Sequence, residues 1–167
     1  PTSTKVYINR TPTNLLTNGL ILYHSFDGKY MDWMVASSSR NASGQNNHGA
    51  PTGITRNSVR SGKVGQALNF NGSTDYITIG DTNSVDFGTG GFTMSAWVNP
   101  RSGNTIDSII GKDEATGRQF IWWVNARNGG TLTAGAMEIA GWFAGGSFND
   151  VYTAGGLVPK NTWTHVT

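Results

Sequence analysis

Carboxylates are the side chains of this 167-residue chain that could perform acid–base chemistry, and there are ten of them. Hydrolysis of a glycosidic bond needs two carboxylates placed across the sugar ring. Asp113 and Glu114 are adjacent in an expected turn, where neighbouring side chains diverge, and Glu138 stands alone in the sequence. We therefore interpret these carboxylates as solvated or turn residues, which argues against a hydrolase.

The chain lacks the sequence motifs of several other kinds of catalysis. It contains no Gly-x-Ser-x-Gly elbow, no His-Glu-x-x-His pair and no phosphate-binding loop. Its three histidines, His24, His48 and His165, are scattered along the sequence. Cysteine is absent, which excludes disulfides, thiol catalysis and cysteine zinc sites. We expect that the protein is not an enzyme.

Aromatic side chains are a better indication of a ligand surface. Exposed Trp and Tyr rings stack on the apolar faces of sugar rings, and the chain has six Trp. Trp33 and the pair Trp142 and Phe143 stand in loop-like segments next to glycines, so they are the predicted ligand-binding residues. Packing beneath a long loop is the competing interpretation for each of them.

The composition indicates an all-β domain to position these residues. Glycine is abundant, with 23 residues, and Thr, Val, Ile, Tyr and Trp recur in short runs. The net charge is only +2 and basic residues form no run, so we expect no nucleic-acid partner. No apolar run has the length of a membrane span, and we expect no membrane contact from this segment.

Short apolar runs separated by turn signals predict an antiparallel β-sandwich or jelly roll. Residues 1–18 are expected to form an extended leader, and residues 19–167 a single domain. The run FTMSAWVNP should point Met94, Ala96 and Val98 to one face and Trp97 to the other. The turn at Asn71–Asp75 predicts a hairpin between its flanking strands. The expected strands lie within residues 19–28, 63–70, 75–80, 92–100, 108–113, 119–127, 131–146 and 161–167.

Five motifs in this order resemble the laminin-G-like, concanavalin A-type sandwich domains of bacterial secreted and cell-surface proteins. They are GLILYHSFDG, SGQNNHG, GKVGQALNFNGSTDYITIG, FTMSAWVNP and WTHVT. The resemblance spans residues 19–167 and implies a concanavalin A-like fold. Strands that usually follow WTHVT are missing, so we expect a sandwich lacking its C-terminal strands or completed by a donated strand. It also implies that Trp97, Trp163 and one of Trp122 and Trp123 belong to the core.

The resemblance further implies a calcium site. Calcium prefers oxygen ligands from Asp, Asn and backbone carbonyls. The implied ligands are Asp27 after the first strand and Asn46 or Asn47 in the Ser-Gly loop, with Asp75 joining if its turn packs nearby. Turn formation is the alternative explanation for Asp27 and Asp75. One departure weakens the metal site, because Asn41-Ala42 replaces the usual Asp of this loop.

Three functions follow as expectations. The first is a non-catalytic extracellular or cell-surface module that binds a glycan or a surface protein through loops at one sandwich edge. The second is a structural head of a pilin-like filament or surface layer, whose partners would be copies of itself or a strand-donating chain. The third is an ancillary carbohydrate-binding domain of a glycosidase. The fold alone does not choose among them.

Overall fold

The structure is a computed structural model, and it describes residues 18–34, 38–87, 90–103, 105–114, 117–125, 127–128, 131–142 and 148–167. Antiparallel strands dominate these residues, and the only helices among them are three short 3-10 turns. The predicted all-β fold class is therefore confirmed. Among the described residues, no helix has the length and apolar character needed to cross a membrane.

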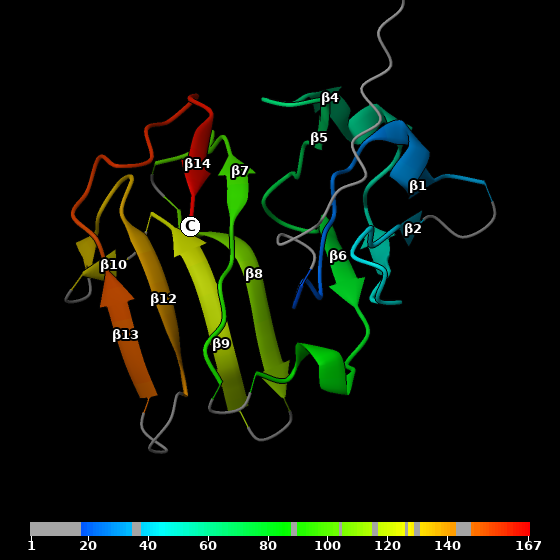
Figure 1. Cartoon of the computed structure of the whole chain (residues 1–167). Helices are drawn as coiled ribbons and strands as arrows, with labels where there is room; N and C mark the ends of the chain where they lie inside the picture. Colours follow the sequence, from blue (N-terminus) through cyan, green and yellow to red (C-terminus); the bar gives the residue numbers. More distant parts are fainter. Residues whose placement is uncertain are drawn as a thin grey trace, which may run out of the picture.

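The longest strands of the structure form a four-stranded antiparallel sheet (Figure 1). Its order is β13-β12-β9-β8. β8 and β9, which fall in two of the predicted strand segments, pair in antiparallel register, with one irregularity after Ser108 and another after Lys112. The four strands are β8 (Asp107–Glu114), β9 (Gly117–Val124), β12 (Met137–Trp142) and β13 (Phe148–Tyr152).

A strand pair lies in front of this sheet and closes the apolar core. β7 (Ala96–Val98) pairs with β14 (Thr164–Val166) in antiparallel register. Between the two layers, Trp122 and Val124 of β9 pack with Val166 of β14 and with Val158. Met94, Ala96, Val98, Ile109, Ile110, Met137 and Ile139 complete this cluster. The alternation predicted for residues 92–98 is confirmed, because every second residue points into the core.

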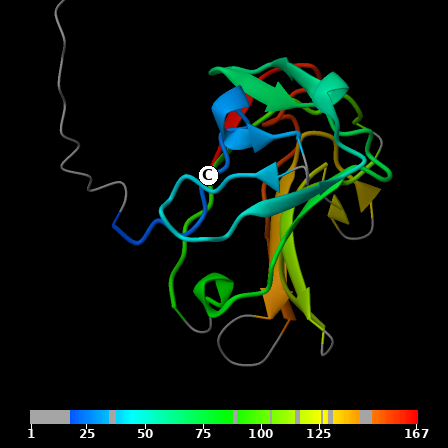
Figure 2. The ribbon, with the colours of Figure 1, turned by 90° about the vertical axis from the view of Figure 1, so that its right-hand side faces the viewer.

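A second, loop-rich region contains the first half of the described chain. Figure 2 views the main sheet nearly edge-on, with this region to one side of it. Its sheet has the order β1-β2-β3-β6. The strands are β1 (Met31–Asp32), β2 (Ser38–Ser39), β3 (Gly49–Thr52) and β6 (Tyr76–Ile79).

The remaining elements are short. β4 (Val59–Ser61) pairs with β5 (Gln66–Leu68), and β10 (Arg127–Asn128) pairs with β11 (Thr131–Leu132). The 3-10 turns are η1 (Gly28–Tyr30), η2 (Arg56–Ser58) and η3 (Asn83–Val85).

The strand predicted for residues 19–28 is wrong. This segment joins no sheet and ends in η1. Side-chain amides hold it instead: Asn41 and Asn47 each donate an Nδ2 hydrogen to the carbonyl of Ile21, both at 3.0 Å. A side-chain amide can satisfy a backbone carbonyl as well as a β-ladder hydrogen bond does. Hydrophobic periodicity carries no signal of such a contact.

The hairpin predicted across Asn71–Asp75 is also wrong, although the turn itself forms. β5 turns back onto β4 at Gly62–Gly65, where Gly65 has a φ of +62°, and β6 pairs with β3. Within the turn, Asn71 Oδ1 accepts the backbone N–H groups of residues 73–75 at 2.8–3.1 Å. The SGKVG sequence carried the signal of the true hairpin, since its two glycines permit the tight reversal.

Three smaller predictions need correction. Asp113 and Glu114 do not form a turn, because β8 continues to Glu114 before the chain reverses. Glu138 is not solvated, since it is buried within β12. Trp97 lies on the outer face of β7 with 43% of its surface exposed, so it is not a core residue. Its indole contacts the His165 ring and the Lys63 ammonium instead. One of Trp122 and Trp123 was predicted to belong to the core, and Trp122 is the buried one.

Candidate functional site

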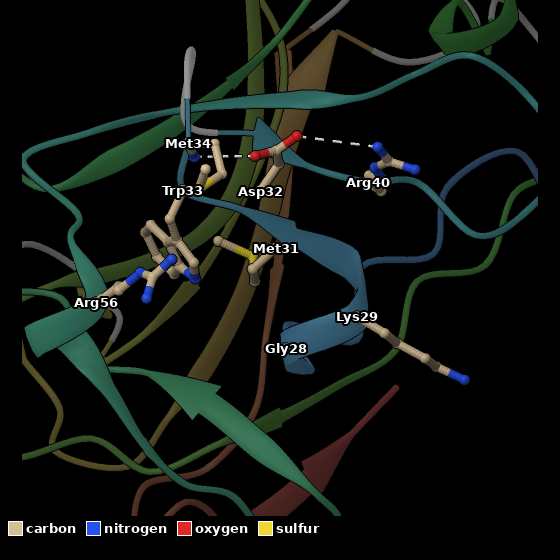
Figure 3. Close-up of a pocket in the computed structure, with 8 residues that line it drawn as sticks. All are labelled: Gly28, Lys29, Met31, Asp32, Trp33, Met34, Arg40 and Arg56. Carbon is tan, nitrogen blue, oxygen red and sulfur yellow. Dashed lines mark hydrogen bonds and ion pairs between the residues drawn. The ribbon is translucent and has the colours of Figure 1, made fainter.

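An open groove of about 500 Å³ surrounds Trp33 in the loop-rich region (Figure 3). Trp33 follows β1 directly and is half-buried, so one part of the indole remains accessible. The groove combines this ring with charged side chains from η1, β1 and η2. Its lining residues are Gly28, Lys29, Met31, Asp32, Trp33, Met34, Arg40 and Arg56.

The backbone on both sides of Trp33 is fixed. Before it, Met31 is buried and pairs with Ser39, which is fully buried. After it, the Met34 N–H donates to Asp32 Oδ1 at 3.0 Å, closing an Asx turn around Trp33. The ring is therefore presented by a braced segment, which reduces the entropy that ligand binding must overcome.

Arg56 is positioned by a separate device, the capping box of η2. Thr55 Oγ1 accepts the Asn57 N–H, and the Thr55 N–H donates to Ser58 Oγ, both at 3.2 Å. Ile54, immediately before this turn, is 4% exposed and anchors it to the interior. Arg56 is exposed, and its guanidinium makes no hydrogen bond or ion pair with any residue in the described part of the chain. Its guanidinium is available to a ligand.

A second hollow of about 330 Å³ lies next to the groove. Trp33 and Arg56 line both hollows, and the second adds Ile54, Thr55 and Asn57. Figure 3 shows the Trp33 ring and the Arg56 side chain at the same end of the groove. An accessible indole between two hollows, with a hydroxyl and an amide nearby, is an arrangement that can stack on a ring and hydrogen-bond its substituents.

The charge of the groove is mostly positive. Lys29, Arg40 and Arg56 line it with a single carboxylate, Asp32. Arg40 Nη2 lies 3.9 Å from Asp32 Oδ2, and both side chains are well exposed, so this ion pair is weak. The Lys29 ammonium lies 4.7 Å from the centre of the Tyr30 ring. Figure 3 shows Lys29 extending away from Trp33, which leaves Arg56 as the cation beside the indole.

A network of buried polar side chains supports the strands beneath the groove. His24 lies within hydrogen-bond distance of Ser39 Oγ through Nδ1, at 2.7 Å, and of the Asn47 carbonyl through Nε2, at 3.2 Å. Because a carbonyl only accepts, Nε2 carries the hydrogen and Nδ1 accepts from the Ser39 hydroxyl. Burial lowers the pKa of His24, the hydrogen bond to the Asn47 carbonyl opposes this, and the nearby His48 adds to the lowering.

The predicted calcium ligands each have their own hydrogen-bond partners within the protein. Asn47 is buried, and its Oδ1 already accepts from the hydroxyls of Thr82 and Ser84 at 3.0 and 3.1 Å. Asn46 is exposed, and its carbonyl accepts the His48 N–H. Within the described ranges, no three Asp, Glu or His side chains are grouped closely enough to hold a metal ion. The calcium site stays a prediction.

Asp27 and Asp75 make the same two kinds of contact, one with a backbone N–H group and one with a glycine. Asp27 Oδ1 accepts the Gln66 N–H at 2.8 Å, and its carboxylate packs against Gly65. Asp75 Oδ2 accepts the Asn71 N–H at 3.0 Å, and its carboxylate packs against Gly53. Both glycines have positive φ, and a Cβ at either would collide with the carboxylate. Each Asp therefore fastens one turn.

The side chains of the other predicted ligand residues lie outside the described part of the structure, so their role stays a prediction. Trp142 ends β12, where its backbone pairs with Phe148, and Phe143 lies outside the described residues. Arg56, Arg40 and Lys29 were missed by sequence reasoning. Isolated basic residues in a Ser- and Asn-rich segment look like ordinary solvated side chains, and only the fold shows that three of them line one groove with a tryptophan.

Comparison with known families places the fold. Residues 71–167 match the family described as the concanavalin A-like lectin/glucanases superfamily. This match covers more than half of the chain, and the chain belongs to that superfamily. Neither the curated proteins nor the solved structures contain a match to it. The groove residues precede the matched span, so the match does not bear on their role.

Proposed function

We propose that this domain is a non-catalytic recognition module that binds a glycan at the Trp33 groove, on an extracellular or cell-surface protein. The observation that carries the proposal is the half-buried indole of Trp33, braced on both sides and shared by two hollows. The superfamily to which the chain belongs is described as containing both lectins and glucanases. The superfamily supports a carbohydrate ligand but does not distinguish binding from hydrolysis.

The non-catalytic part of the proposal rests on the carboxylates. Asp32 is the single carboxylate that lines either hollow. Its Oδ1 accepts the Met34 N–H, and its Oδ2 lies 3.9 Å from Arg40 Nη2. A general acid and a second carboxylate on opposite sides of a bound sugar ring are not provided by these linings. Binding through stacking and hydrogen bonds needs neither.

A glycan array tests the proposal, with the purified chain applied in calcium and again in EDTA. We expect binding that Trp33→Ala reduces by at least about 10-fold, because stacking on a desolvated indole contributes roughly 1.5 kcal/mol. Trp97→Ala is the matched control, since Trp97 is also an exposed indole but lies on the outer face of β7. Circular dichroism verifies that both variants fold.

The outcomes separate the candidates. Loss of wild-type binding in EDTA would support the predicted calcium site and direct substitutions to Asp27 and Asn47. Equal losses in the two tryptophan variants would contradict a site at Trp33. A folded wild-type protein that binds no glycan would contradict the proposal and favour the structural subunit.

One observation supports that second candidate. β13 pairs only with β12 among the described strands, and its Val151 and Tyr152 are 67% and 44% exposed. An outer strand with exposed apolar side chains can accept a strand from another chain. Light scattering on the same sample measures whether the chain self-associates.

A further inference from the structure

We infer that the Trp33 groove selects acidic glycans, with the anionic group of the sugar held by Arg56 and the sugar ring stacked on Trp33. This inference rests on the proposed function and names its ligand class. The shared chemistry is a sugar that carries a carboxylate or a sulfate. Neutral sugars would bind at the same indole but without the ionic contact.

The distribution of charge is the first argument. Three of the twelve Lys and Arg residues line the groove, with one of the ten Asp and Glu residues. The rest of the chain therefore carries nine residues of each sign. The groove lining therefore carries a formal charge of +2, equal to that of the whole chain, and the remaining charges balance in number. A local excess of one sign raises the concentration of oppositely charged ligands at that surface.

The state of Arg56 is the second argument. Arg40 shares the groove with its partner Asp32, and Lys29 lies over Tyr30. The Arg56 guanidinium has no hydrogen bond or ion pair within the described residues, yet the capping box and buried Ile54 hold the turn that carries it. A planar guanidinium on a fixed backbone can form two parallel hydrogen bonds with a carboxylate or a sulfate.

The relation between Arg56 and Trp33 is the third argument. Both line each of the two hollows, so a ring stacked on the indole would bring its substituents within the same space as the guanidinium. In the second hollow, Thr55 and Asn57 add a hydroxyl and an amide for the neutral hydroxyls of the sugar. The arrangement matches an acidic sugar in three respects: the ring face, the hydroxyls and the charge.

Matched polymers test the inference on the unmodified protein. Polygalacturonate and its methyl ester share one sugar backbone and differ only in the charge of the carboxyl group. Dextran sulfate and dextran likewise share one sugar backbone and differ only in the sulfate groups. We expect the charged member of a pair to bind on the order of 10-fold more tightly, as one charge-assisted contact would give. The preference should fall as NaCl is raised, because exposed ionic contacts are screened.

A substitution then assigns the preference to Arg56. Arg56→Gln should abolish the difference between the charged and uncharged polymers. Arg101→Gln is the matched control, because Arg101 is exposed and lines neither hollow. Trp33→Ala should weaken both members of each pair.

The results distinguish a failure of the acidic-glycan inference from a failure of the proposed glycan binding. Equal binding of the charged and uncharged polymers, unaffected by Arg56→Gln, would overturn the inference and leave glycan binding intact. A preference that Arg101→Gln removes as fully as Arg56→Gln would also overturn it, because the effect would then come from overall charge. Preference within only one polymer pair identifies the carboxylate or the sulfate as the bound group. Absence of binding to every polymer and every array glycan would contradict both the inference and the proposed function.

Discussion

The two regions of this molecule are stabilised in different ways. Within the described residues, the region from β7 to β14 buries seven apolar side chains, whereas the loop-rich region buries two, Met31 and Ile54. The loop-rich region buries three polar side chains, Ser39, Asn41 and Asn47, each satisfied by hydrogen bonds, and the first region buries two, Asn125 and Glu138. The first region depends on apolar packing, and the second depends on a few directional amide and hydroxyl contacts.

This difference has a physical consequence for substitutions. Apolar packing is non-directional and is shared among many neighbours, so its loss scales with the volume removed. A buried amide acts through individual donors and acceptors, so exchanging one atom is enough to leave a carbonyl facing another oxygen. The loop-rich region should therefore be sensitive to changes that hardly alter side-chain size.

The largest effect is expected from Trp122→Ala in the sandwich core. Trp122 is 6% exposed and packs between β9 and the β7–β14 pair. Its truncation should lower the free energy of unfolding by about 3–5 kcal/mol, measured by urea denaturation. Trp97→Ala, on the exposed face of β7, serves as the control. A loss at Trp122 no greater than that at Trp97 would contradict the core assignment.

A smaller but more local effect is expected from Asn41→Asp. Asn41 Nδ2 donates to the carbonyls of Ile21 and Gln45, and its Oδ1 accepts the N–H groups of Tyr23 and Ser43. A carboxylate keeps the acceptor but turns an oxygen toward two carbonyls, which should cost about 1–3 kcal/mol.

Hydrogen exchange locates this effect. Faster exchange should be confined to the segments that Asn41 joins, near residues 20–24 and 41–48, while β9 and β12 keep their protection. Asn46→Asp is the control with the same chemical change at an exposed position. Uniform acceleration across both regions would show that they do not differ as described.

The smallest effect is a pH dependence that originates at His24. Folding lowers the pKa of His24, so between its unfolded value near 6.5 and the lower folded value the unfolded chain binds more protons. The stabilisation is present above pH 6.5 and is lost as the pH falls through that interval. Melting temperatures at pH 7.5 and 5.5 should differ more in the wild type than in His24→Gln. Identical pH responses would contradict the prediction.

The sandwich region was predictable because its signal is periodic. Alternation over residues 92–98 and the apolar run of β9 both arise from burial on a pleated sheet. The loop-rich region carries no such period. Its segment from Gly19 to Asp27 resembles a strand in composition but is fastened by Asn41 and Asn47, which lie about twenty residues further along the chain. Long-range amide contacts leave no trace in local hydrophobicity.

The groove was predictable only in part. Trp33 could be selected because an indole among small and polar residues is unusual. Arg56 could not, since an exposed arginine carries no information about its neighbours until the fold places it beside Trp33. The charge excess was visible in the sequence as a net +2. Its concentration at one surface was not.

The contacts of Asp27 with Gly65 and of Asp75 with Gly53 have an evolutionary consequence. Because a Cβ at either glycine would occupy the space of the facing carboxylate, a side chain at position 65 requires a change at Asp27, and one at position 53 requires a change at Asp75. The positive φ of both glycines strengthens the restriction. Among descendants of this sequence the two glycines should therefore persist for as long as the facing Asp does, while the surrounding loop residues diverge.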